Sequence, residues 1–199
     1  MVSNISRLFL PPSTKMNVVL LGDRSYGYKE NDELFFQRRL LSRKLSDVPD
    51  VDIYSIDSKI RKEDLEEFPQ GLLVNNEFLY GLKQVPKPIH VDARMSLAHY
   101  SPDFLGLKDD GEYTSEIINL IFKKLMPGGS FLCTVGQRLG YLITNPLERL
   151  GLDYTYVQNP KRITFWEKKF TDVEMIIAYK PGEFNNPHKE TLKQALGLY

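Results

Sequence analysis

The chain has 199 residues, of which 42% are hydrophobic and 26% are charged, a composition typical of one globular domain with a sizeable core. Lys plus Arg and Asp plus Glu each number 26, so the net charge is zero, which argues against a protein that is basic over its whole surface. A single cysteine, Cys133, excludes a disulfide framework and predicts a reducing, cytoplasmic location, and no apolar run approaches the roughly 20 residues of a membrane helix.

Residues 1–15 contain a short apolar patch and two prolines, too broken for a signal peptide, and are expected to form an arm. The domain is expected over residues 16–181. Residues 17–21 are aliphatic and end at Gly22, which predicts a first, buried parallel strand. A loop from Gly22 to Gly27 follows. Apolar residues at helical spacing then predict an amphipathic helix over residues 31–46.

Three further strands are expected in the middle of the chain. Residues 51–56 alternate in polarity and end at Asp57, and a charged stretch over 59–68 predicts a helix after them. Residues 71–74 predict a third strand and residues 89–92 a fourth, which ends at Asp92. The amide-rich segment 75–80 either lines a crevice or forms a turn with an aromatic plug.

The most informative segment runs from Tyr113 to Gln137. Its helical pattern stops at Pro127-Gly128-Gly129, and the apolar run 131–135 follows at once, which predicts a helix, a tight turn and a buried strand. Residues 145–150 predict another helix. Residues 154–157 and 175–179 predict two last strands. Only five residues separate the turn at 166–169 from the final strand, and so short a connection predicts an antiparallel neighbour. The tail over 182–199 forms either a terminal helix docked on the domain or a mobile segment.

The Pro127-Gly128-Gly129 segment and its strand closely resemble the passage before the fifth strand of class I S-adenosylmethionine (SAM) methyltransferases. The resemblance implies an α/β fold: a doubly wound, mainly parallel seven-strand sheet in the order 3-2-1-4-5-7-6. One antiparallel strand near the C-terminus is implied as well. The resemblance also implies SAM as the cofactor and methyl transfer as the activity.

Ligands of open parallel sheets lie outside the carboxyl ends of the strands, where the strand order reverses. This rule selects Gly22 and Asp23 after the first strand, Asp57 after the second, and Asp92-Ala93-Arg94 after the fourth. By resemblance, Gly22, Asp23, Gly27 and Asp57 bind SAM, with Asp57 on the ribose hydroxyls. Asp92 and Arg94 are the candidate catalytic residues.

The first loop departs from the family's acid-x-Gly-x-Gly pattern. It has one glycine in the expected place, and Arg24 and Tyr26 stand where small residues belong. An ordinary strand-to-helix turn is the alternative for this loop, and a turn cap is the alternative for Asp57. A nucleotide phosphate loop is not expected because Tyr28-Lys29 follows Gly27. The three histidines, His90, His99 and His188, are not grouped, so no metal site is expected.

The 2′-O-ribose methyltransferases use a Lys-Asp-Lys-Glu set, for which Lys15, Asp92 and Glu174 are candidates. Thr134 stands at the position of the second lysine, so the set is incomplete. Basic and aromatic residues over 123–169 suggest an RNA-binding rim, although a solvated charged surface is the commoner arrangement. Two hypotheses follow: a SAM-dependent methyltransferase acting on RNA of the 2′-O or cap type, or a catalytically inactive domain that binds a protein partner or RNA.

Overall fold

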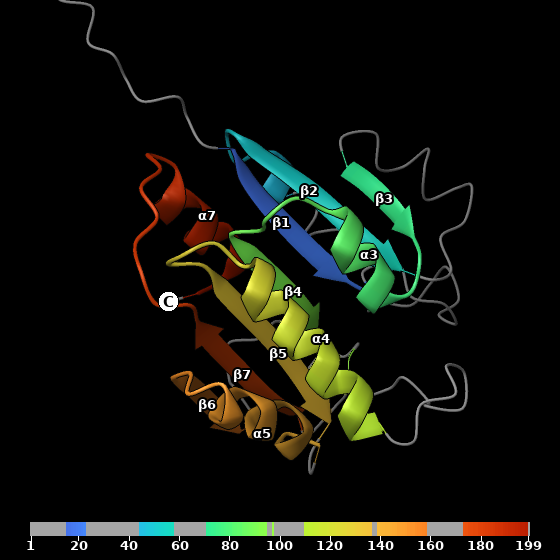
Figure 1. Ribbon diagram of the computed structural model, residues 1–199. Coiled ribbons are helices and arrows are strands. Elements are labelled where there is room, and N and C mark those ends of the chain that lie inside the picture. Colours follow the sequence, from blue (N-terminus) through green and yellow to red (C-terminus); the bar gives the residue numbers. More distant parts are fainter. Residues whose placement is uncertain are drawn as a thin grey trace, which may run out of the picture.

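The computed structural model describes residues 15–22, 44–57, 71–94, 97, 110–136, 139–158 and 173–198. Within these residues seven strands form one sheet (Figure 1). The strands are β1 (Met16–Leu21), β2 (Val51–Asp57), β3 (Gly71–Asn75), β4 (His90–Arg94), β5 (Ser130–Gly136), β6 (Tyr154–Gln158) and β7 (Val173–Tyr179). The helices are α3 (Phe78–Gln84), α4 (Asp110–Lys124), α5 (Tyr141–Arg149) and α7 (Lys189–Leu196). None of these helices is long and apolar enough to cross a membrane.

The strand order is β3-β2-β1-β4-β5-β7-β6, as the sequence predicts. Strands β1 to β5 pair in parallel, whereas β7 is antiparallel to both β5 and β6. The predicted doubly wound sheet with one reversed strand is therefore confirmed. The chain moves outward from β1 to β3 on one side and from β4 on the other, so the order reverses between β1 and β4.

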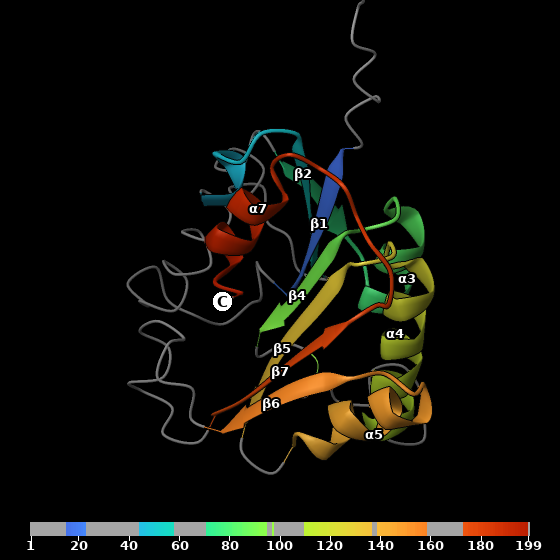
Figure 2. The same cartoon turned by 90° about the vertical axis from the view of Figure 1, so that its left-hand side faces the viewer.

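Each face of the sheet carries its own apolar core. Helices α3, α4 and α5 lie on one face, and α7 lies on the other (Figure 2). The larger core joins side chains of α3, α4 and α5 to β1, β4, β5 and β7, and the smaller core joins α7 to the amino-terminal parts of β1 and β2. Because each strand alternates its side chains, one strand supplies residues to both cores.

The buried face of helix α4 explains why the sequence before Pro127 indicated a helix. Ile117, Ile121 and Leu125 are spaced one helical turn apart and are all buried against the sheet. Phe122 on the same helix meets Phe131 of β5 in an edge-to-face contact with ring centroids 6.0 Å apart. The predicted helix-turn-strand unit is confirmed.

Steric contacts explain why the two turn positions, 128 and 129, are both glycine. Gly128 has φ of +71°, and a Cβ there would lie 2.9 Å from the backbone nitrogen of Phe184. A Cβ on Gly129 would lie 2.8 Å from the carbonyl oxygens of Ile89 and Met126. The turn is therefore packed tightly between the start of β4 and the chain that follows β7, where only glycine fits.

Helix α3 was not predicted from the sequence. It begins inside the segment 75–80, and Phe78 is buried in the larger core, 2% exposed. Gly81 is the contact point with the sheet, because a Cβ there would overlap the Cγ2 of Ile56. A seven-residue helix with an internal glycine has little intrinsic helical signal, so packing against β2 must stabilise it.

The C-terminal segment docks on the domain. Phe184, Leu192 and Leu196 are buried in the smaller core, and Gly197 ends α7 in the left-handed conformation. Of the two alternatives for this tail, docking is the observed one. The predicted helix over 59–68 lies outside the described residues, as does most of the helix over 31–46, of which residues 44–46 are described and helical.

Two lysines cap the carboxyl ends of neighbouring helices. Lys180 Nζ donates hydrogen bonds to the carbonyl oxygens of Phe122 at 2.6 Å and Leu125 at 2.7 Å, at the end of α4. Lys124 Nζ donates in the same way to Leu82 and Val85 at the end of α3, and burial lowers the pKa of Lys124. Both amines satisfy carbonyl groups that have no partner within their own helix.

Candidate functional site

The candidate site lies at the carboxyl end of the sheet, where the parallel strands β1 to β5 finish. Gly22 follows β1 directly and has φ of +69°. Its N–H donates to the carbonyl oxygen of Ile56 on β2 at 2.9 Å, so the chain leaves β1 while still attached to its neighbour. A glycine in this conformation lets a ligand approach the backbone closely.

Asp57 is the last residue of β2, beside Gly22, and is only 4% exposed. Its carbonyl oxygen accepts a hydrogen bond from the N–H of Asn76 at 3.1 Å, and Asn76 Oδ1 in turn accepts from the N–H of Glu77 at 2.9 Å. The loop after β3 is thereby tied to the end of β2. Burying a carboxylate costs free energy, and carboxylates that are buried at the carboxyl end of a sheet often belong to functional sites. Asp57 is therefore a candidate ligand-binding residue.

Asp92 lies in the middle of β4, opposite Leu20 of β1 and Leu132 of β5, and is 4% exposed. The expectation that the strand ends at Asp92 is wrong, because pairing with β5 continues to Arg94. Its near neighbour is His90, whose Nε2 lies 3.8 Å from Asp92 Oδ2. His90 Nδ1 lies 2.8 Å from Ser130 Oγ on β5. This contact is not among the features predicted from the sequence, where His90 is considered only as a metal ligand, although the i, i+2 spacing on a strand signals it.

The structure brings part of the predicted site together. Asp57 and Asp92 lie on β2 and β4, the two neighbours of β1, which Gly22 directly follows, and Arg94 is the last residue of β4. Asp23 and Gly27 lie outside the described residues. The described residues hold no group of three or more His, Cys, Asp or Glu side chains that could bind a metal ion. Cys133 is buried, and burial raises the pKa of its thiol, as does the nearby charge of Asp92.

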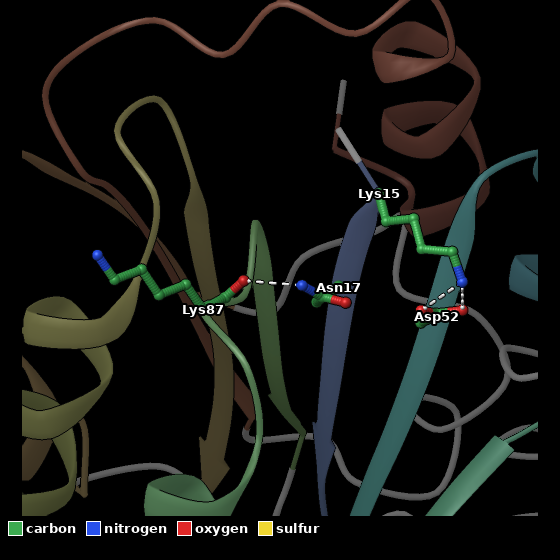
Figure 3. Close-up of polar contacts among 4 residues, drawn as sticks. All are labelled: Lys15, Asn17, Asp52 and Lys87. Carbon is green, nitrogen blue, oxygen red and sulfur yellow. Dashed lines mark hydrogen bonds and ion pairs between the residues drawn. The ribbon is translucent and has the colours of Figure 1, made fainter. Parts of the chain in front are cut away.

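Lys15 lies at the opposite end of the sheet from Asp92. It precedes β1, and its Nζ forms an ion pair with Asp52 near the start of β2 at 2.9 Å (Figure 3). Asn17 Nδ2, close by, donates to the carbonyl oxygen of Lys87 at 3.1 Å. The assignment of Lys15 to a catalytic Lys-Asp-Lys-Glu set is therefore wrong, because β1 separates Lys15 from the carboxyl end.

Glu174 lies at the carboxyl end of the sheet, but its carboxylate binds the start of helix α5. It pairs with Val135 in the register of β5 and β7 and is 5% exposed. Its Oε2 accepts a hydrogen bond from the N–H of Gly140 at 2.8 Å, at the start of α5. A carboxylate there favours the helix through the free N–H groups and the dipole. Thr134 of β5, beside Arg94, is 3% exposed.

The described part of the basic and aromatic rim also has structural partners. Lys124 caps α3, as shown above, and the hydroxyl of Tyr154 donates to Glu148 Oε1 at 2.7 Å. Tyr156 is 40% exposed on β6. The residues of the rim at 161–169 lie outside the described residues.

No protein-family model matches the sequence, and no curated protein matches it. Solved structures do match the fold. The N-methyltransferase NodS from Bradyrhizobium japonicum WM9 superposes with a TM-score of 0.53 at 13% identity, over 85% of this chain and 88% of that one. A SAM-dependent methyltransferase from Archaeoglobus fulgidus superposes with a TM-score of 0.52 at 13% identity, over 84% and 87%.

A second structure of NodS, in complex with S-adenosyl-L-homocysteine, gives a TM-score of 0.51 at 13% identity, over 83% of this chain and 78% of that one. At such low identity the likeness concerns the backbone and not the side chains of the site. The chain thus has the fold of the class I SAM-dependent methyltransferases.

Proposed function

We propose that the protein is a SAM-dependent methyltransferase whose site is the carboxyl end of β1, β2 and β4. The observation that carries the proposal is the placement of two buried carboxylates, Asp57 and Asp92, on either side of Gly22. This is the point where the strand order reverses and where open α/β sheets bind their ligands. The shared fold of NodS and the Archaeoglobus methyltransferase supports it.

The described residues fit SAM in chemistry and position. Gly22 offers backbone that the methionine part can approach, since glycine has no side chain and adopts its φ of +69° without strain. Asp57 offers a carboxylate that accepts hydrogen bonds from the two ribose hydroxyls. When bound, SAM supplies an electrophilic methyl group. Asp92 lies one strand further along, where it orients the nucleophile of the acceptor.

Calorimetric titration with SAM and with S-adenosylhomocysteine tests the binding step. We expect saturable binding, and at 100 times the Kd the ligand should stabilise the protein by about 2.7 kcal/mol in thermal unfolding. ATP, which shares the adenosine but lacks the amino acid, is the matched control and should bind much more weakly. A wild-type protein that shows no binding at millimolar SAM would overturn the proposal.

RNA is the acceptor that we propose, of the 2′-O or cap type. What supports it is the pair of buried carboxylates Asp92 on β4 and Glu174 on β7, which match two members of the Lys-Asp-Lys-Glu set. What counts against it is Thr134 at the lysine position and Lys15 at the far end of the sheet. Transfer of labelled methyl groups to capped and uncapped RNA, protein and small-molecule panels decides between acceptors.

A non-catalytic domain that binds a protein partner or RNA is the second candidate. The missing lysines favour it, because no described lysine lies beside Asp92 on β1, β4 or β5 to activate a ribose hydroxyl. SAM binding without transfer to any of the panels would support this candidate. The single buried cysteine, held as a free thiol, supports a reducing compartment and a cytoplasmic location.

A further inference from the structure

Three polar side chains lie together on the face of the sheet that α7 covers. His90 and Asp92 alternate on β4, so both point to this face, and Ser130 stands opposite His90 on β5. Their exposed fractions are 1%, 4% and 8%, respectively. Together they form a buried row from Ser130 through His90 to Asp92.

Within the part of the chain that the structure describes, the strand positions beside this row are apolar. The strand positions beside it are Val18 and Leu20 on β1 and Leu132 on β5, each at most 2% exposed. An imidazole and a carboxylate lose hydration in such a place, and polar contacts, among them the one between these two groups, must offset that cost. An apolar residue at position 90 would pack in the smaller core without this cost. Because a histidine costs more to bury here than an apolar side chain, its polar contacts are expected to have a function.

The hydrogen-bonding partners determine which ring nitrogen carries the proton. Ser130 Oγ lies 2.8 Å from Nδ1, a distance at which the hydroxyl either donates or accepts. If Nδ1 carried the proton, the lone pair of Nε2 would face the carboxylate oxygen of Asp92 at 3.8 Å, and the two negative regions would repel each other. The opposite arrangement, in which Ser130 donates to Nδ1, turns an N–H toward Asp92.

We infer that His90 is a positioning residue, held by Ser130 as the tautomer protonated on Nε2, and that its N–H orients the carboxylate of Asp92. The part of this inference that concerns turnover rests on the proposed methyltransferase function. His90 itself is buried below Asp92, toward the amino end of the strand, and touches no substrate. The contact at 3.8 Å is longer than a hydrogen bond, and such contacts tighten when a substrate binds.

Orientation matters at Asp92 because a carboxylate on a strand rotates about its side-chain bonds unless a neighbour holds it. A displacement of about 1 Å in a reacting group costs on the order of 100-fold in rate. The sheet holds the backbone of β4 between β1 and β5, and His90 holds the side chain from below. The row thus joins the rigid core of the sheet to the candidate site.

Nitrogen-15 NMR of protein labelled at histidine tests the tautomer without any ligand. The chain has three histidines, and variants at each one assign the signals. We expect the nitrogen chemical shifts of His90 to show a ring that is protonated on Nε2 and unprotonated on Nδ1. In Ser130→Ala this pattern should weaken into a mixture of tautomers, while Thr114→Val, which removes a buried hydroxyl on α4, should leave it unchanged.

Kinetics test the consequence for Asp92. We expect His90→Leu to lower kcat by about 10- to 100-fold with little change in SAM affinity. The reason is that positioning of Asp92 stabilises the transition state of methyl transfer and not the bound SAM. His90→Gln keeps an N–H donor and should recover part of the loss. A purely structural histidine would instead lower the melting temperature in both variants and leave kcat of the folded enzyme intact.

The two measurements separate the inference from the proposed function. A His90 ring protonated on Nδ1, or an unchanged tautomer in Ser130→Ala, overturns the inference whatever the activity. Wild-type kcat in His90→Leu overturns it as well. If the wild type binds no SAM, the methyltransferase proposal fails, and the NMR result alone decides whether His90 presents its N–H to Asp92.

Discussion

The two ends of the sheet differ in what their polar residues do. At the amino end, Lys15 pairs with Asp52, Asn17 donates to the carbonyl of Lys87, and Lys180 caps α4. Each of these contacts joins two segments of the fold. Toward the carboxyl end, Asp57 is buried beside Gly22 and Asp92 is buried in β4 on the other side of β1, where the strand order reverses.

The most recognisable motif of the sequence belongs to the amino end. Gly128 and Gly129 are there because backbone from Ile89 and Phe184 passes too close for any side chain. Their role is packing, and the same packing serves any protein with this fold, active or inactive. The glycine turn therefore identifies the fold, whereas evidence for ligand binding and catalysis must come from Asp57 and Asp92.

The largest effect is expected at the amino end. Gly128→Ala should lower the free energy of unfolding by about 2–4 kcal/mol, because it combines a positive φ with overlap against backbone. Gly151→Ala is the matched control: φ is +63° but no atom lies within 4 Å, so about 1–2 kcal/mol is expected. Urea unfolding measures both. Equal losses would show that the turn is not packed as described.

At the carboxyl end, Asp92→Asn keeps the shape of the side chain and removes its charge. We expect turnover to fall by roughly 100-fold, about 2.7 kcal/mol, with SAM affinity within a few-fold of wild type. Steady-state kinetics on the best acceptor and calorimetry give the two quantities. Full turnover in the variant would remove Asp92 from the site.

Asp57→Ala should weaken SAM binding by about 1.5–3 kcal/mol, the loss of hydrogen bonds to a charged group, with little change in ligand-free stability. Asp52→Ala is the control on the same strand, since Asp52 belongs to the amino end and pairs with an exposed lysine. That variant should leave SAM affinity unchanged and cost at most about 1 kcal/mol of stability. A loss of stability in Asp57→Ala as large as the loss of affinity would make Asp57 a structural cap.

Lys180→Met should cost about 1–2 kcal/mol of stability, because two carbonyl oxygens at the end of α4 lose a charged donor. SAM affinity should not change. Lys193→Met, which breaks an exposed ion pair with Glu190 on α7, should cost no more than about 0.5 kcal/mol. Thermal unfolding of the two variants side by side checks the difference, and a reversed ranking would contradict the capping role.

The smallest effect is expected at Cys133. Since burial raises the pKa of its thiol, the thiolate fraction stays negligible at pH 8 and the native protein should not react with iodoacetamide. Alkylation should appear only as the protein unfolds in urea. Rapid labelling of the native protein would show that β5 is not buried between its two layers.

The sequence predicted the parts of the fold that local pattern determines. Ile117, Ile121 and Leu125 predicted α4 because their spacing is the helical repeat, and the apolar run after Gly129 predicted β5. Helix α3 escaped because it is short and contains Gly81, so its stability comes from contact with Ile56 and not from its own residues. Lys15 was misplaced because the assignment to the catalytic set disregarded its position directly before β1, which puts it at the amino end of the parallel strands and away from Asp92.

By itself the sequence determined the kinds of elements, their order and the reversal of the last strand, because periodicity and loop length act between residues close in the chain. Only the tertiary structure decided which polar groups meet. Ser130 and His90 are 40 residues apart and touch through strand pairing, and Glu174 reaches Gly140 across 34 residues. Such contacts follow from the register between strands, which the cooperative packing of both cores fixes and no single segment encodes.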